Sequence, residues 1–353
     1  CWIEDSRLVV LNARDAEERG ATIMTRTKVV SAARVDGVWE IVSENDGVRQ
    51  THTARALVNA GGPWVENIVR DVARLNTSEG VRLVRGSHIV TKRLYDHDKC
   101  YFFQGTDGRI IFAIPYETDF TLIGTTDAEH DGDPRDAVCT PEERDYLVAF
   151  ANLYFKQHIS AEDVVWTYSG VRPLYDDGAK SATAATRDYV LSEEDNGPVL
   201  LNVFGGKITT YRKLAEDAFD KLKPFYPEAS GHWTAGVPLP GGDFPVDGVE
   251  ALIADLRARY GFLDDRWARR LVKAYGTEAV EVLGEATAAS DLGRDFGATL
   301  TEAEVRWLRD REYARSAADI VWRRSKLGLR LSAEQIAEID AYLQSNGTPV
   351  AAE

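Results

Sequence analysis

The sequence has little cysteine and no metal-binding spacing, which excludes two kinds of small stabilised domain. It contains three cysteines among 353 residues, Cys1, Cys100 and Cys139, which lie far apart and show no C-x-x-C spacing. No H-x-x-x-H or H-E-x-x-H pattern occurs among its six histidines. A disulfide framework and a zinc site both need paired or closely spaced ligands. We therefore expect neither, no bound metal, and a reducing compartment.

Long apolar runs and an excess of positive charge are also missing. No stretch approaches the roughly 18 uninterrupted apolar residues of a membrane-spanning helix. The 42 Lys and Arg residues against 57 Asp and Glu residues leave a formal net charge of −15, and the field of an acidic protein repels polyanions. We expect no transmembrane segment and no nucleic acid partner, so any anion-binding site must be local.

The glycine-rich phosphate-binding motifs are absent as well. Neither G-x-G-x-x-G nor G-x-x-x-x-G-K-[ST] occurs, so these residues do not contain the primary diphosphate cradle of a dinucleotide site. The sequence begins with Cys1, and its single methionine is Met24. We therefore expect a fragment whose N-terminal segment is missing.

The first part of the chain alternates between helical and extended patterns. Residues 6–20 repeat apolar side chains at three- and four-residue intervals, which predicts an amphipathic helix. Residues 21–30 and 37–43 alternate with the period of a strand, and Asp36-Gly37 between them predicts a hairpin.

Two further patterns follow in the first 235 residues. Aromatic and β-branched runs over residues 81–171 predict a mostly antiparallel sheet, interrupted by a helix at 141–158. Twice, a short apolar strand ends in a glycine pair that leads into a helical pattern. These two units are residues 55–60, Gly61-Gly62 and 64–75, and residues 198–204, Gly205-Gly206 and 208–222.

Beyond residue 231 the composition becomes helical and rich in charge. The segment 238–245, with three prolines and a glycine pair, predicts a linker. Thr301-x-x-Glu304 and Ser332-x-x-Gln335 match the capping box that opens a helix. The predicted helices are residues 246–260, 264–275, 277–285, 301–326 and 332–344.

The two glycine pairs are the first candidate site. Glycine lets backbone amides approach a phosphate or a flat ring closely, and a helix N-terminus favours an anion. A double glycine at a strand end is also an ordinary tight turn, so each pair alone has two readings. The presence of two such units in one chain favours a nucleotide-type ligand.

Four chemically active side chains lie at strand ends or turns of this acidic chain. Arg172, Arg187 and Lys207 suit a small phosphate or carboxylate substrate, because such groups fix an anion in one orientation. A surface salt bridge is the alternative for each. His88, before an apolar strand, can accept the proton of a substrate hydroxyl near neutral pH, with a structural histidine as the alternative.

Several sequence strings are more specific than these patterns. They are A-L-V-N-A-G-G-P-W-V (56–65), R-G-S-H (85–88), I-G-T-T-D (123–127), Y-S-G-V-R-P-L (168–174), T-R-D-Y (186–189), F-G-G-K-I-T-T-Y-R-K-L-A (204–215) and D-I-V-W-R-R-S-K-L-G (319–328). Together, and in this order, they resemble the FAD-dependent glycerol-3-phosphate dehydrogenases, the respiratory enzymes. The last string is similar to the signature of that family's helical C-terminal domain.

The resemblance implies a fold and its division into domains. The expected fold is an FAD/NAD(P)-binding Rossmann-like α/β domain of the glutathione-reductase and D-amino-acid-oxidase type, truncated at its N-terminus, with an inserted antiparallel substrate sheet and an all-α C-terminal domain. The FAD and substrate domain would span residues 1–235, with the sheet at about 76–175, and the helical domain residues 236–353. Because the family's opening βαβ unit with its glycine fingerprint is not here, we expect the fragment by itself to be inactive and colourless.

The resemblance also implies a reaction and its residues. The family oxidises sn-glycerol 3-phosphate at C2 to dihydroxyacetone phosphate, passing hydride to FAD and electrons to a quinone. By this resemblance His88, as the base at the C2 hydroxyl, and Arg172 would be catalytic. Arg187, Lys207 and Thr209 would bind the substrate. The FAD-binding residues would be Ala60, Gly61, Gly62, Trp64, Gly205, Gly206, Lys207, Ile208 and Thr209.

Partners and alternatives follow from the same resemblance. It implies peripheral attachment to the inner, cytoplasmic face of the cytoplasmic membrane, a quinone acceptor and a homodimer. A related oxidase that passes its electrons to oxygen shares the same strings, and peroxide production in air would separate it from a dehydrogenase. The remaining alternative is an inactive fragment that folds without flavin.

Overall fold

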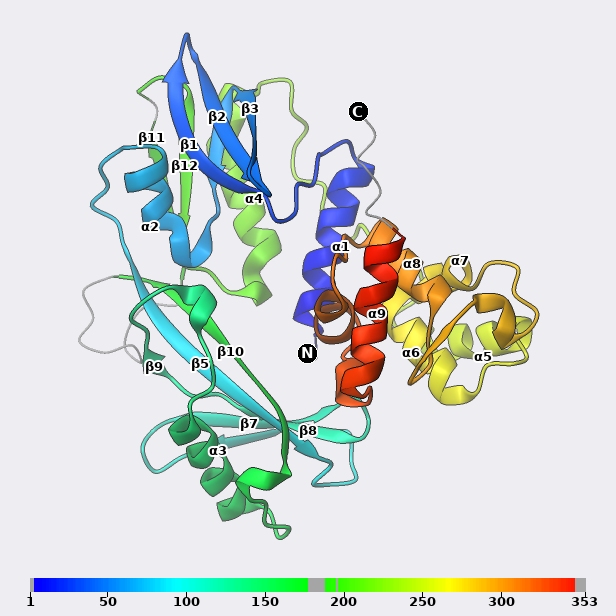
Figure 1. Cartoon of the computed structure of the whole chain (residues 1–353). Coiled ribbons are helices and arrows are strands. Elements are labelled where there is room, and N and C mark those ends of the chain that lie inside the picture. Colours follow the sequence, from blue (N-terminus) through cyan, green and yellow to red (C-terminus); the bar gives the residue numbers. More distant parts are fainter. Residues whose placement is uncertain (1–2, 177–187, 195, 347–353) are drawn as a thin grey trace. The chain divides into compact units, whose positions relative to one another are not determined.

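The computed structural model describes residues 3–176, 188–194 and 196–346 (Figure 1). Contacts within the chain divide it into two compact units. One combines Cys1–Thr25 with Trp233–Glu353, and the other is Arg26–His232. The second unit ends close to the boundary expected after residue 235, whereas the first 25 residues group with the C-terminal helices.

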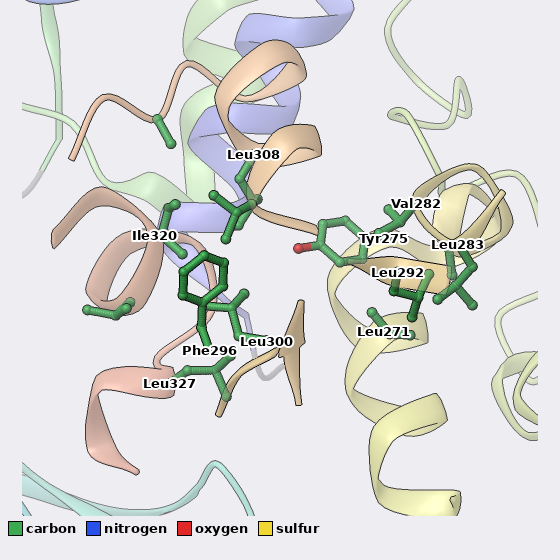
Figure 2. Packing of buried hydrophobic residues seen from close by; sticks show 14 of the residues in the cluster. Leu271, Tyr275, Val282, Leu283, Leu292, Phe296, Leu300, Leu308, Ile320 and Leu327 are labelled. Carbon is green, nitrogen blue, oxygen red and sulfur yellow. The ribbon is translucent and has the colours of Figure 1, made fainter. Parts of the chain in front are cut away.

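The unit that contains the C-terminus is mainly helical. Its apolar side chains form one buried cluster, of which Figure 2 shows a part that includes Leu271, Phe296 and Ile320. A two-stranded sheet accompanies the helices. The elements are α1 (Asp5–Glu18), α5 (Val249–Arg259), α6 (Asp265–Tyr275), α7 (Ala279–Leu283), β13 (Asp295–Gly297), β14 (Leu300–Thr301), α8 (Glu302–Arg311), η9 (Asp319–Arg324) and α9 (Ala333–Ser345).

The single helix predicted over residues 301–326 is wrong, because the chain turns near its middle. α8 ends at Arg311, and Tyr313 has a φ of +60°, a left-handed conformation through which a right-handed helix cannot continue. The Glu312 carbonyl accepts hydrogen bonds from the Arg324 guanidinium instead of from a helical amide. Only the short π-helical turn η9 follows.

Of the two predicted capping boxes, one is confirmed and one is wrong. The Ser332 side chain accepts from the Gln335 amide, and the Gln335 side chain accepts from the Ser332 amide. The Thr301 side chain makes no such bond. Glu304 is 1% exposed, and its carboxylate accepts two bonds from Arg270, at 2.6 and 2.7 Å. A buried, charge-assisted hydrogen bond is stronger than a bond to a backbone amide, so the Glu304 carboxylate binds Arg270 and does not cap the helix.

Two arginines on α1 fix this helix within the helical unit. Arg7 and Arg14 are only 7% and 2% exposed. Arg7 donates two hydrogen bonds to Glu312, and Arg14 donates two to Glu278, at 2.6 and 2.7 Å. The predicted N-terminal helix is confirmed. Because a buried guanidinium without its carboxylate is costly, these pairs explain why the helix groups with the C-terminal helices and not with the domain expected over residues 1–235.

The second unit begins with a three-stranded antiparallel meander of β1 (Lys28–Val35), β2 (Val38–Asn45) and β3 (Val48–Ala54). The predicted hairpin at Asp36-Gly37 is confirmed, with Val35 paired to Val38. The strand predicted over residues 21–30 is wrong for residues 21–27, because β1 begins at Lys28. β3 was not predicted, because its residues are polar and mostly exposed.

A small mixed sheet carries both predicted strand–glycine–helix units. β12 (Val199–Phe204) is fully buried and lies between β11 (Val190–Glu194), which is antiparallel to it, and β4 (Ala56–Asn59), which is parallel to it. Since β4 and β12 run in the same direction, their glycine pairs leave the sheet at the same edge. The helix predicted at 64–75 is a mixture of short turns. The elements that follow the strands are η1 (Gly62–Trp64), α2 (Val65–Asn67) and η2 (Ile68–Val72), and η5 (Ile208–Thr210) and α4 (Tyr211–Leu222).

The predicted antiparallel sheet is confirmed as a six-stranded sheet of order β10-β5-β8-β7-β6, with β9 also paired to β5. Figure 1 shows β5 and β10 as two long strands side by side. α3 (Pro141–Tyr154) covers one face, where Leu147 and Phe150 pack against Ile89 and Ile123. The strands are β5 (Val81–Lys92), β6 (Tyr101–Gln104), β7 (Ile110–Tyr116), β8 (Phe120–Gly124), β9 (Ala128–Glu129) and β10 (Val164–Tyr175).

No helix in the described ranges is both long enough and apolar enough to cross a lipid bilayer.

Candidate active site

His88 and Arg172 lie on one face of the six-stranded sheet. His88 is on β5, and on the neighbouring β10 Tyr168 pairs with His88 while Arg172 pairs with Val84. Alternate residues of a strand share a face, so the side chains of His88, Tyr168 and Arg172 point to the same side. The imidazole stacks on the Tyr168 ring, with centroids 4.8 Å apart and planes inclined by 5°.

Glycines make room for both side chains. A Cβ on Gly86 would lie 2.7 Å from Cζ of Arg172, and one on Gly124 would lie 2.7 Å from Cγ of His88. Both distances are too short for real atoms, so the guanidinium and the imidazole lie against bare backbone. Gly170 pairs with Gly86, and a Cβ on Gly170 would meet nothing within 4 Å. Among the described residues, nothing therefore covers this face at Gly170.

A bulged segment next to β5 holds Arg172. β8 and β9 both pair with β5, and Thr125, Thr126 and Asp127 lie between their pairings. The Asp127 carboxylate accepts from Nη1 of Arg172 at 2.7 Å, and Thr125 Oγ1 accepts from Nη2 at 2.9 Å. Bulges redirect side chains, and this one brings a carboxylate and a hydroxyl onto one guanidinium. The Arg172 side chain is still 34% exposed, so it is fixed and yet accessible.

A buried carboxylate contacts the reverse side of this bulge. Thr126 Oγ1 accepts from the Ser87 amide at 2.9 Å and donates to Oε1 of Glu143 at 2.7 Å. Glu143 lies in the first turn of α3 and is 8% exposed. Burial by itself raises the pKa of the Glu143 carboxyl, but hydrogen bonds from Thr126 and its neighbours outweigh burial and hold this pKa below its ordinary value. The group is therefore a carboxylate at neutral pH.

The two glycine pairs form a second group of candidate residues. Gly62, Gly205 and Gly206 have φ values of +54°, +73° and +102°, which other residues rarely adopt. In the adjoining strands, the Asn59 side-chain amide donates to Oδ1 of Asn202 at 2.9 Å. Nδ2 of Asn202 is buried and has no hydrogen-bond partner among the described residues.

The turn after β12 lies next to the end of β10, the strand that carries Arg172. A Cβ on Gly205 would lie 3.4 Å from the Tyr175 amide nitrogen at the end of β10. The predicted ligand-binding side chains on the two glycine turns are exposed. The exposed side chains are Ala60, Trp64, Lys207, Ile208 and Thr209.

The residues present fit a flavin nucleotide. Such a ligand needs backbone that carries no obstructing side chain, and polar donors that still lack an acceptor. The left-handed glycines provide the first, and the unsatisfied amide of Asn202 provides the second. Both lie toward the carboxyl ends of β4 and β12, and open α/β sheets bind their ligands outside the carboxyl ends of strands. Gly61, Gly62, Gly205 and Gly206 are the residues that would line FAD.

The structure thus brings together His88 and Arg172 on one sheet face, and the two glycine pairs on one sheet edge. Lys207 and Thr209 belong to the second group, which meets the first at the end of β10. The predicted substrate ligand Arg187 lies outside the described residues. The chemical role of each residue stays a prediction.

Tyr168 and Thr125 were not among the residues predicted from the sequence, and Asp127 was not connected with Arg172. All three lie inside the strings that carry the family resemblance, and that position is the signal that could have found them. Periodicity could not, because contact with His88 or Arg172 depends on which strands are neighbours.

Comparisons with known proteins match both parts of the chain. The family model for FAD dependent oxidoreductases matches residues 1–212. The model for the C-terminal domain of alpha-glycerophosphate oxidase matches residues 232–344.

Individual relatives match nearly the whole chain. The glycerol-3-phosphate dehydrogenase of Pseudomonas aeruginosa is 47% identical over 348 residues, which are 98% of this chain and 68% of that protein. The D-erythritol 1-phosphate dehydrogenase of Brucella abortus is 44% identical over 350 residues, 98% of this chain and 70% of that protein.

A solved structure has the same fold. The crystal structure of the glycerol-3-phosphate dehydrogenase from Bacillus halodurans, complexed with FAD, superposes with a TM-score of 0.79 at 25% identity. The match covers 99% of this chain and 74% of that one. With a fold, two family models and close relatives in agreement, this chain belongs to the FAD-dependent oxidoreductases and, within them, to the glycerol-3-phosphate dehydrogenase family.

Proposed function

We propose that this protein oxidises the C2 hydroxyl of sn-glycerol 3-phosphate to the ketone of dihydroxyacetone phosphate, with FAD as its cofactor. The names of its relatives support this substrate. One observation carries the proposal. The imidazole of His88 and the guanidinium of Arg172 lie on one face of the six-stranded sheet with glycine backbone between them, and the guanidinium is both fixed and accessible.

Arg172 holds the substrate in this proposal. Its guanidinium is planar, permanently charged and already oriented by Asp127 and Thr125, so binding an anion costs little further ordering. Lys207, on the exposed turn after β12, adds a second positive charge for the phosphate. Arg187 and Thr209 are proposed to complete the substrate contacts.

His88 accepts the proton of the C2 hydroxyl. Stacking on Tyr168 and contact with Gly124 fix the ring plane, and a positioned histidine is the usual general base near neutral pH. As the O–H bond breaks, its proton passes to the imidazole and its electron pair forms the C=O bond. When bound, FAD supplies the acceptor for the hydride that leaves C2.

A quinone acceptor, peripheral attachment to the inner face of the cytoplasmic membrane and a homodimer complete the proposal. They rest on the family resemblance. Sedimentation with vesicles of anionic and neutral phospholipids tests the attachment, and turnover with a short-chain quinone against turnover with oxygen tests the acceptor. Stoichiometric hydrogen peroxide in air would favour the oxidase alternative, which the name of the C-terminal family model also raises.

A second candidate substrate is D-erythritol 1-phosphate. The observation that favours it is the Brucella abortus relative, whose identity of 44% is close to the 47% of the Pseudomonas aeruginosa enzyme. Both substrates present an anionic phosphate and a secondary hydroxyl, so the face between His88 and Arg172 suits either.

The test is steady-state turnover of the flavin-loaded enzyme with each phosphate ester and a dye as electron acceptor. We expect a higher kcat/KM for glycerol 3-phosphate, and we expect His88→Ala to lower kcat by about 100-fold or more, the usual effect of removing a general base. His158→Ala, at an exposed histidine in the segment after α3, is the matched control. A His88→Ala enzyme with unchanged turnover would remove this residue from the chemistry.

A further inference from the structure

We infer that Glu143, which contacts the reverse side of the bulge from α3, is a positioning residue for Arg172 and acts through Thr126. The inference rests on the proposed function, because it takes Arg172 to be a substrate-binding group. It adds a residue that touches neither substrate nor cofactor and that no sequence motif marked.

The bulge connects Glu143 to Arg172. In the bulge, the side chains of Thr125 and Asp127 both contact the Arg172 guanidinium, whereas the side chain of Thr126 contacts Glu143. The Thr126 carbonyl also accepts from Nη1 of Arg172, at 3.5 Å. A shift of Thr126 therefore moves both residues that orient the guanidinium.

β5 and Glu143 together hold the amide and the hydroxyl of Thr126. Its amide donates to the Ser87 carbonyl at 3.3 Å, its Oγ1 accepts from the Ser87 amide at 2.9 Å, and its hydroxyl donates to Glu143 at 2.7 Å. Since Thr126 is 3% exposed, water cannot replace a lost partner cheaply. The hydroxyl needs both β5 and Glu143 to be satisfied.

Glu143 makes more contacts than a helix cap requires. It completes the capping box of α3 with Thr140, whose amide donates to Oε2 at 3.1 Å. The same carboxylate accepts from Nε of Arg85 at 3.1 Å, and both side chains are mostly buried. A glutamate that only capped α3 would need neither Arg85 nor Thr126, so the additional bonds tie the helix to the bulge.

The charge of Glu143 sets the direction of these bonds. A carboxylate can only accept, so the Thr126 hydroxyl must donate to it, which leaves the Thr126 oxygen lone pairs for the Ser87 amide. In Glu143→Gln the single side-chain oxygen faces the donors of Thr140 and Arg85, and the NH2 group faces Thr126. The cap survives, while the bond to the bulge is reversed and weakened.

The experiment compares variants of the flavin-loaded enzyme by steady-state kinetics with glycerol 3-phosphate and a dye acceptor. Loss of one buried hydrogen bond behind a substrate-binding group predicts a rise in KM of about tenfold for both Glu143→Gln and Thr126→Val. Since the lost interaction holds the substrate and does not take part in proton or hydride transfer, kcat changes by less than about twofold.

Two further variants control for non-specific effects. Thr126→Ser keeps the hydroxyl and restores the KM of the unmodified enzyme. Glu142→Gln alters the neighbouring carboxylate on the exposed side of the same helical turn, and leaves KM unchanged.

A double-mutant cycle with Arg172→Met tests whether Glu143 acts through Arg172. In the Arg172→Met background the guanidinium that Glu143 positions is absent. Adding Glu143→Gln should therefore change KM by less than about twofold, so the effects of the two substitutions on KM are not additive. The same tenfold factor in both backgrounds overturns the inference. A lowered melting temperature with an unchanged KM in Glu143→Gln also overturns it, because Glu143 is then only structural.

The cycle also separates this inference from the proposed function. If Arg172→Met by itself leaves KM unchanged, Arg172 does not bind the substrate. This result contradicts both the positioning role of Glu143 and the proposed substrate role of Arg172. If Arg172→Met raises KM while Glu143→Gln and Thr126→Val do not, the substrate role of Arg172 stands and only the positioning role of Glu143 fails.

Discussion

The guanidinium of Arg172 lies directly against the backbone of Gly86, so closely that a Cβ on Gly86 would be 2.7 Å from Cζ and from Nη1. Gly86 is on β5 and Arg172 is on β10, offset by two residues in the pairing of the strands. The guanidinium can therefore lie flat on the sheet only because this position has no side chain.

Gly86→Ala is predicted to displace the guanidinium and to raise KM for glycerol 3-phosphate by about tenfold or more, in the range of a lost charged hydrogen bond. Flavin content should stay unchanged, because Gly86 is not one of the glycines at the edge of the mixed sheet. Steady-state kinetics and the flavin absorbance per chain measure both. Gly231→Ala, where an added Cβ meets nothing within 4 Å, is the control, and equal KM values for the two variants would contradict the prediction.

The buried pair of Arg7 and Glu312 is predicted to dominate the stability of the helical unit. Glu312 is 0% exposed and Arg7 is 7% exposed. Removing one partner leaves a buried charge uncompensated, so Glu312→Ala should lower the free energy of unfolding by about 3–5 kcal/mol. Urea denaturation followed by circular dichroism measures it.

The matched control is Glu338→Ala, which breaks an ion pair with Arg294 whose side chains are both about half exposed. This change should cost no more than about 1 kcal/mol, because solvent screens exposed pairs. Similar losses for Glu312→Ala and Glu338→Ala would show that burial of the first pair does not decide its contribution.

The pKa of Glu143 predicts a pH dependence of stability. This pKa lies below its ordinary value of 4.5 in the folded protein. A carboxyl with a lowered pKa stabilises the fold fully above its unfolded pKa, and loses that contribution as the pH falls through its folded pKa. The difference in melting temperature between the unmodified protein and Glu143→Gln should therefore be constant above about pH 5 and shrink below it.

Thr126→Val checks the cause of this dependence. It removes one of the hydrogen bonds that lower the pKa of Glu143 in the folded protein, so the acid loss of stability should be smaller in this variant and should be complete at a higher pH. Melting curves followed by circular dichroism at a series of pH values give both results. A difference that stays constant down to the acid-unfolded range would refute the assignment of a lowered pKa to Glu143.

The flavin content of the 353-residue chain expressed by itself gives another prediction. The chain supplies the glycine pairs of β4 and β12 but no G-x-G-x-x-G cradle, and the diphosphate of a dinucleotide depends on that cradle for much of its binding. Once unbound FAD has been removed, the purified chain should therefore retain far less than one flavin per molecule, so the turnover assays are run with excess FAD. Visible absorbance after gel filtration with added FAD measures it, and a stoichiometric flavin band would contradict the prediction.

Local patterns predicted the fold wherever neighbouring residues decide it. Asp36-Gly37 makes the β1–β2 hairpin, and Ser332 with Gln335 opens α9, because both signals act within four residues. The same kind of signal failed at Thr301, where Glu304 binds the distant Arg270 instead of the local amide. A capping motif cannot show that a stronger partner is present in the folded protein.

The candidate site shows the same division between local and distant information. The chain marked His88 and Arg172 by residue type and by the strings around them, and it marked the glycine pairs by their place after apolar strands. It gave no sign of Glu143, because its contacts Thr126 and Arg85 lie 17 and 58 residues away, and α3 meets β5 only by packing.

By itself, the amino-acid sequence determined the family, the position of the main strands and helices, and the types of reactive side chain available. Only the tertiary structure decided that β5 lies between β10 and β8, and this order places Arg172 against Gly86, and His88 against Gly124 and Tyr168. The packing of α3 on the sheet places Glu143 against Thr126. The reason is physical: residue type and local spacing fix the chemistry and the period of a strand, whereas contacts between strands depend on which buried faces pack together over the whole chain.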